Sequence, residues 1–152
     1  MRIEGEYTFR APCEVVFDLL QNPDALSKAM PGATQLVKIG EDSYEAQMTV
    51  KIGSINGTYA GTIAVQESQR PEHFRLLVEG KGAAGFLKGE GTVDLEPSAE
   101  GTLIHYAGET QVGGRIAQVG QRLVEAVARK VINQGLQSLE NQLAASPESE
   151  QE

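Results

Sequence analysis

The stretch GKGAAGFLKGEG, from Gly80 to Gly91, decides how the chain folds, because glycine recurs in it at short intervals. Its first six residues match G-x-G-x-x-G, which in dinucleotide-binding proteins connects a strand to the N-terminus of a helix. Here residues of alternating polarity flank the stretch on both sides, which predicts two strands and no helix. Neither Lys81 nor Lys88 precedes a serine or threonine, so the P-loop pattern is also missing. We therefore interpret the stretch as a β-hairpin.

The pairing within this hairpin predicts where its glycines point. A four-residue loop over 83–86 would place Gly80 opposite Gly89 and Val78 opposite Gly91. Because successive strand residues face opposite sides, the glycines would share the apolar face and the charged residues would face solvent. The strands predicted over 55–66 and 102–112 repeat this arrangement. The glycines expected on the inner face are Gly57, Gly61, Gly80, Gly82, Gly89, Gly91 and Gly108.

So many glycines on one buried face require an explanation. Each glycine in a strand is roughly 0.5–1 kcal/mol less favourable than alanine. Glycines can let a strongly coiled sheet bend, or let a helix approach closely. They can also leave a hollow between the sheet and a covering helix. The sequence leaves these explanations open.

The rest of the chain divides into strands and helices by its apolar period. Ile3, Tyr7 and Phe9 alternate with charged residues and indicate an opening strand. Pro12 suits the start of a short helix, and a second short helix is expected over 24–30. After Gly113 the apolar period becomes 3.6 and predicts one helix of about thirty residues. The remaining predicted strands are 34–39, 43–52, 55–66, 73–82, 87–96 and 102–112.

These elements predict an α+β fold. We expect a seven-stranded curved antiparallel sheet, two short helices after the first strand, and a long C-terminal helix packed over the sheet. Residues 1–145 would form a single domain. Residues 146–152 would form a disordered acidic tail.

The composition limits the functions to consider. A net charge of −8 and a pI near 4.8 argue against binding to nucleic acid, whose phosphates attract basic surfaces. The sequence has neither a secretory signal nor the roughly 18 apolar residues of a membrane helix, so a cytoplasmic location is expected. Cys13 is the single cysteine, and His73 and His105 are the only histidines. No metal-ligand spacing or acid–base pair stands out, so we expect no metal, no cofactor and no catalysis.

A hollow beneath the long helix would be apolar and would suit a hydrophobic small molecule. Tyrosine hydroxyls that point inward need a partner, and one could orient a quinone or carbonyl oxygen. The candidate cavity residues are Phe17, Met48, Tyr59, Gly61, Ile63, Leu76, Gly80, Gly89, Gly91, Tyr106, Gly108, Leu123 and Val127.

A basic stripe is predicted on the long helix. Arg115, Arg122 and Arg129 recur at intervals of seven residues, with Lys130 beside them. The stripe is either a solvated face with a Glu125–Arg129 pair, or a docking surface for an acidic partner or anionic lipid head groups.

Three segments carry a resemblance to a known family. They are MRIEGEYTFRAPCEVVFDLLQNPDALSKAMPGA at the start, GKGAAGFLKGEG, and GGRIAQVGQRLVEAVARKV. Over about residues 1–143 the chain resembles the carbon monoxide dehydrogenase G-subunit family, a START-like (SRPBCC) group. The order of its elements is similar to the helix-grip fold.

The resemblance implies a non-catalytic accessory protein of a molybdenum hydroxylase. Such a protein would handle a hydrophobic, quinone- or lipid-like ligand, with peripheral contact at the inner face of the membrane, and could be oligomeric. Two alternatives remain. The same fold hosts cyclase- and hydrolase-like enzymes of small molecules, and the chain could also be a purely structural assembly factor.

Overall fold

The computed structural model describes residues 1–29, 36–52 and 55–145. The end of the second predicted helix at Met30 and the predicted acidic tail over 146–152 therefore lie outside the described residues.

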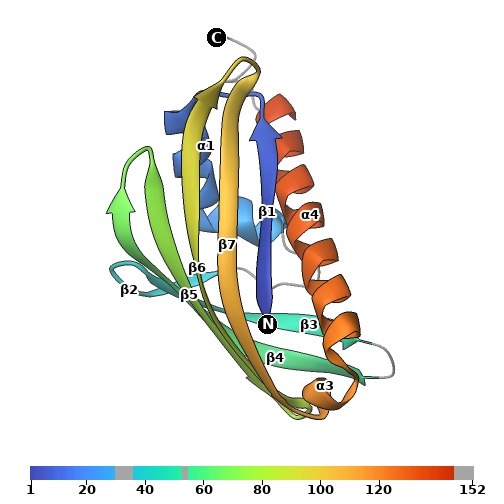
Figure 1. Ribbon diagram of the computed structural model, residues 1–152. Coiled ribbons are helices and arrows are strands. Elements are labelled where there is room, and N and C mark those ends of the chain that lie inside the picture. Colours follow the sequence, from blue (N-terminus) through green and yellow to red (C-terminus); the bar gives the residue numbers. More distant parts are fainter. Residues whose placement is uncertain (30–35, 53–54, 146–152) are drawn as a thin grey trace.

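One antiparallel sheet forms most of the molecule. Its order is β1-β7-β6-β5-β4-β3-β2, so β2 to β7 are neighbours in chain order, whereas β1 pairs with β7 at the far edge from β2. Figure 1 shows the long strands bending together around the helices. This confirms the predicted curved seven-stranded sheet. The strands are β1 (Arg2–Phe9), β2 (Val37–Gly40), β3 (Ser43–Ile52), β4 (Ile55–Gln69), β5 (His73–Gly82), β6 (Gly85–Ser98) and β7 (Gly101–Gly114).

Two short helices follow β1, as predicted. Helix α1 (Cys13–Leu20) begins after Pro12, whose φ of −65° suits a helix start. Helix α2 (Pro23–Ala29) is capped by Asn22, whose side-chain oxygen accepts hydrogen bonds from the backbone N–H groups of Asp24 at 2.9 Å and Ala25 at 3.2 Å. Both helices bury apolar residues against the sheet and α4 (Gln121–Ala145).

The β5–β6 hairpin differs from its predicted register. Gly82 pairs with Gly85 and Gly80 with Leu87, so the loop contains two residues instead of four. Gly85 permits this short loop because it adopts φ +138°, which is accessible to glycine. The register therefore moves by two residues. Because side chains alternate with a period of two, every residue stays on its predicted face.

The predicted single C-terminal helix is interrupted. Helix α3 (Arg115–Gln118) ends before Gly120, which has φ +102°, and α4 starts at Gln121. Glycine at that φ breaks the helical path, although the apolar spacing continues through it. Helix α4 contacts α2 and both β1 and β3, which lie at opposite sides of the sheet.

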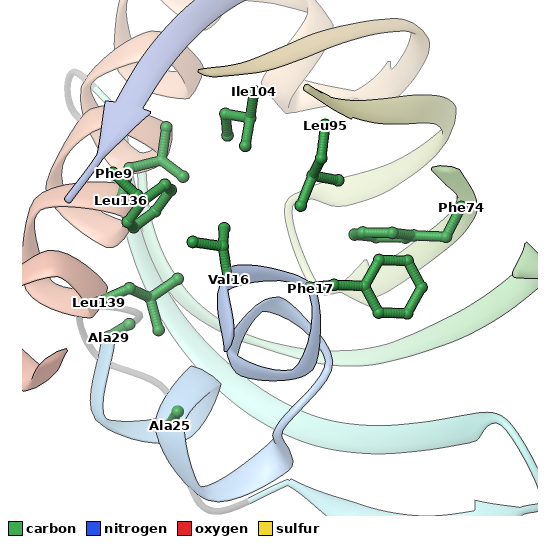
Figure 2. Packing of buried hydrophobic residues seen from close by; sticks show 10 residues of the cluster. All are labelled: Phe9, Val16, Phe17, Ala25, Ala29, Phe74, Leu95, Ile104, Leu136 and Leu139. Atoms are coloured by element: carbon green, nitrogen blue, oxygen red, sulfur yellow. The ribbon is translucent and has the colours of Figure 1, made fainter. Parts of the chain in front are cut away.

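Most of the buried apolar residues form two separate clusters. The main core joins α1, α2 and the C-terminal half of α4 to one end of the sheet, as Figure 2 shows. Within it, Phe17 of α1 meets Phe74 of β5 edge to face, with ring centroids 5.4 Å apart. The second cluster lies near the opposite end and consists of Tyr59, Ala84, Ile116 and Val124, with Met1, Val112, Val119 and Val127 packed against it.

Candidate ligand site

The inner face of the sheet between the two clusters is incompletely covered. Apolar residues face glycines across it in register, as in the pairs Gly80–Leu87 and Val78–Gly89. A residue beneath a packed helix would be buried, but these positions are only half-buried. The half-buried positions are Met48, Gly61, Ile63, Leu76, Val78, Gly80, Leu87, Gly89, Gly91, Tyr106 and Gly108.

Five of these positions form what we call the glycine band: Gly61, Gly80, Gly89, Gly91 and Gly108. At Gly80, the one described atom within 4 Å of an added Cβ is the carbonyl oxygen of Ala60, at 3.9 Å. At Gly61, an added Cβ would meet two carbonyl oxygens of neighbouring strands, at 3.3 and 3.8 Å. No described helix atom lies within that distance of either position. Close approach of a helix therefore does not explain these two glycines.

Gly91 and Gly108 have a different role. They pair across β6 and β7, and an added Cβ on either would lie 2.9 Å from a carbonyl oxygen of the facing strand. These two glycines let the strands approach closely where the sheet curves.

A pocket opens beside the glycine band, between the end of β7 and the start of α4. It has a volume of about 350 Å³ and is lined by Met1, Thr110, Gln111, Val112, Ala117, Gln121 and Val124. We call it the corner pocket. Thr110 faces Gly89 across the β6–β7 pair, and its methyl carbon lies 3.2 Å from a Cβ built on that glycine. Met1, Val112 and Val124 also belong to the second cluster. The corner pocket therefore adjoins both the band and that cluster.

Tyr59 is the buried polar residue of this region. Its side chain is 7% exposed and packs in the second cluster. Its ring lies over Gly82, where an added Cβ would come within 2.6 Å of a ring carbon. Its hydroxyl is buried and has no hydrogen-bond partner among the described residues.

A second tyrosine on the inner face lies in the main core. Burial, and then the nearby Glu140 carboxylate, raise the pKa of Tyr7 above its ordinary value. Glu140 accepts a hydrogen bond from the backbone N–H of Arg10 at 3.3 Å. The Tyr7 ring packs on Phe9, with ring centroids 4.9 Å apart.

Two predicted cavity residues lie elsewhere. Phe17 is 3% exposed in the main core, because α1 packs directly on Phe74. Leu123 was predicted to border the cavity, but it is 38% exposed and its neighbour Val124 is buried instead. The prediction extended one apolar stripe through Gly120, where the helix breaks and the stripe changes direction.

The sequence analysis also missed residues of this region. Val78 and Leu87 were left out of the candidate cavity residues, although alternation along β5 and β6 placed them on the face of the glycine band. Met1 and Thr110 border the corner pocket because the backbone oxygen of Met1 accepts a hydrogen bond from Thr110, at 2.8 Å. That contact depends on the pairing of β1 with β7, which local patterns do not encode.

The basic stripe divides into two parts. Arg129 bonds Glu125 one turn earlier, at 3.0 and 3.2 Å, and donates to the backbone oxygen of Glu4 at 3.1 Å. It therefore ties α4 to β1. Arg115, Arg122 and Lys130 are exposed and form no ion pair with the described part of the chain.

The remaining candidate groups occupy structural positions. Cys13 begins α1, and its sulfur lies 3.4 Å from the hydroxyl of Thr102. His73 contacts Asp94 at 2.6 Å, and exposed His105 lies 3.7 Å from Glu6. Within residues 1–29, 36–52 and 55–145, no group of histidine, cysteine or carboxylate side chains could hold a metal ion. In that same part of the chain, none of the helices is both long and apolar enough to cross a bilayer.

The sequence and structure were compared with known proteins. The family model for the carbon monoxide dehydrogenase G-subunit (CoxG) matches residues 5–144. The chain belongs to the CoxG family. A search of curated proteins found no match.

Solved structures agree with this family assignment in fold. A conserved protein from Geobacillus kaustophilus is 34% identical, with a TM-score of 0.90 and 95% of each chain covered. A START superfamily protein from Mycobacterium smegmatis is 13% identical, with a TM-score of 0.67, covering 93% of this chain and 95% of its own. CV1439 from Chromobacterium violaceum is 17% identical, with a TM-score of 0.70, covering 92% and 95%. This CoxG family member therefore has a START-like fold, as predicted.

Proposed function

We propose that this protein is a non-catalytic accessory protein that holds a hydrophobic, quinone- or lipid-like molecule between the curved sheet and α4. The observation that carries the proposal is the half-buried apolar face between two separate buried clusters. A guest over the glycine band would cover that face and join the two clusters. The corner pocket, at about 350 Å³, has the size of a small ligand site and adjoins the band where Thr110 meets Gly89.

The proposed partner is suggested by the family name. CoxG is named as a subunit of carbon monoxide dehydrogenase, so we propose that the protein assists an enzyme of that molybdenum hydroxylase type. Peripheral contact with the inner face of the membrane is part of the proposal, because a guest of this kind dissolves in the bilayer. The exposed Arg115, Arg122 and Lys130 would contact anionic head groups.

Native mass spectrometry of the protein purified from its own cells, combined with extraction into organic solvent, tests the carrier function. We expect a bound prenyl quinone or acyl lipid. Gly80→Leu should remove this guest from a folded protein, because the new side chain would enter the space above the band. Thr62→Leu is the matched control, since Thr62 is exposed on the opposite face of the adjacent strand.

The outcomes separate the alternatives. A guest that is lost in Gly80→Leu and retained in Thr62→Leu supports the carrier. Loss in Thr62→Leu alone would place the guest at a second pocket of about 270 Å³ on β2, β3 and β4, which Thr62 lines. A protein that carries no extractable molecule would indicate a structural assembly factor.

A further inference from the structure

The Tyr59 hydroxyl is a hydrogen-bonding group without a protein partner in an apolar environment. The side chain is 7% exposed, and its neighbours in the second cluster are Ala84, Ile116 and Val124. None of the described residues donates a hydrogen bond to the hydroxyl group or accepts one from it. Packing fixes the position of the ring, because it lies over Gly82, where a larger residue would displace it.

An unmade buried hydrogen bond is unfavourable, by about 1–3 kcal/mol for a typical group. Phenylalanine would fill the same volume without this penalty, so packing alone does not account for a tyrosine. Two other buried side-chain atoms lack partners among the described residues, on Gln21 and Glu140. Glu140 already accepts a hydrogen bond through its other oxygen, and Gln21 lies at the end of α1. Tyr59 is the one that lies beside the glycine band, in the cluster whose Met1, Val112 and Val124 line the corner pocket.

We infer that the Tyr59 hydroxyl donates a hydrogen bond to a carbonyl oxygen of the guest. This inference rests on the proposed carrier function and specifies its ligand class. The second cluster offers an apolar wall and one donor, which fits a carbonyl-bearing ring or ester attached to an apolar body. It also orients the guest, with its oxygen toward Tyr59 and the second cluster and its apolar body over the glycine band.

A pair of matched probes tests the inference on the full chain. The probes are 2,3-dimethyl-1,4-naphthoquinone and 2,3-dimethylnaphthalene, which share a ring system and differ in the two oxygens. The methyl groups block addition of the Cys13 thiol to the quinone. We expect the wild-type protein, in equilibrium dialysis, to bind the quinone about three- to tenfold more tightly than the hydrocarbon, as one net hydrogen bond provides.

Tyr59→Phe should abolish this preference and leave the affinity for the hydrocarbon unchanged. Tyr7→Phe is the control, because it removes a hydroxyl from the same sheet face but in the main core. If the wild type and Tyr59→Phe show the same preference, the inference is wrong while the carrier function stands. If neither probe binds to the wild type, both the carrier function and the inference fail.

A measurement without ligand provides an independent check. Because the hydroxyl is unpartnered in the empty protein, Tyr59→Phe should leave the thermal midpoint unchanged or raise it. A clear fall in the midpoint would show that the hydroxyl already has a partner in the protein, such as a bound water, and would overturn the inference.

Discussion

At the residue scale, glycines that look alike in the sequence do different things. Gly91 and Gly108 allow two backbones to approach, and Gly82 leaves room for the ring of Tyr59. Gly61 and Gly80 have no helix atom within 4 Å among the described residues. The three explanations offered by the sequence, bending, close packing and a hollow, thus apply to different positions. Only the hollow concerns a ligand.

This division predicts opposite responses to alanine. Gly91→Ala should destabilise the protein by about 1–3 kcal/mol, because its Cβ would lie 2.9 Å from a carbonyl oxygen and the backbone must move. Gly80→Ala should be neutral or stabilising by up to about 1 kcal/mol, because a glycine in a strand is replaced where space exists. Urea unfolding monitored by circular dichroism gives both values. Equal destabilisation by the two variants would contradict the assignment of separate roles.

At the element scale, the break between α3 and α4 determines which residues face the sheet. Gly120 adopts φ +102°, and α4 restarts with Val124 buried and Leu123 exposed. Arg129 then fixes α4 against β1 through the backbone oxygen of Glu4. The helix thereby lies over the concave face and meets α2 at its C-terminal half.

Two glycines of the C-terminal region should therefore respond oppositely to the same change. Gly120→Ala places an alanine at φ +102° and should destabilise the protein by about 1–2 kcal/mol, although no described atom lies within 4 Å of the new methyl group. Gly135→Ala lies inside α4, where the added Cβ would meet the carbonyl oxygen of Ala29 at 4.0 Å, and should stabilise by about 0.5–1 kcal/mol. Thermal unfolding of the two variants measures both effects. If Gly120→Ala were neutral, the break would not depend on glycine.

At the scale of the whole molecule, the chain has a net charge of −8 and also carries the basic stripe, one arginine of which is held in structural contacts. Arg115 and Arg122 stand at the start of α3 and near the start of α4, at the end where the corner pocket lies. A membrane contact there would bring the pocket to the bilayer.

Vesicle flotation tests this arrangement. Binding to vesicles that contain phosphatidylglycerol should exceed binding to phosphatidylcholine alone and should weaken as salt increases. Replacing Arg115 and Arg122 together by Gln should reduce the binding about tenfold or more, at about 1 kcal/mol for each basic residue. Replacing Arg2 and Arg10, which lie on and just after β1, should leave it unchanged. Equal losses in the two double variants would refute a specific docking surface.

How far the sequence alone specified this protein depends on the range of the interactions involved. Periods of two and 3.6 predicted the strands, the short helices and the inward face of the glycines, because these depend on neighbours a few residues apart. Each hairpin residue lies on its predicted face of the sheet although the predicted register was wrong, since a register error of two residues preserves the alternation of side chains. The family could also be recognised from the sequence, because its motifs are short continuous segments of the chain.

Tertiary structure decided what local patterns do not contain. The pairing of β1 with β7 brings Met1 to Thr110, and the break at Gly120 buries Val124 in place of Leu123. The separation of the two clusters and the unpartnered hydroxyl of Tyr59 arise from contacts between residues far apart in the chain. Alternation determines which face a side chain takes, whereas the space left above that face depends on how all the elements pack together.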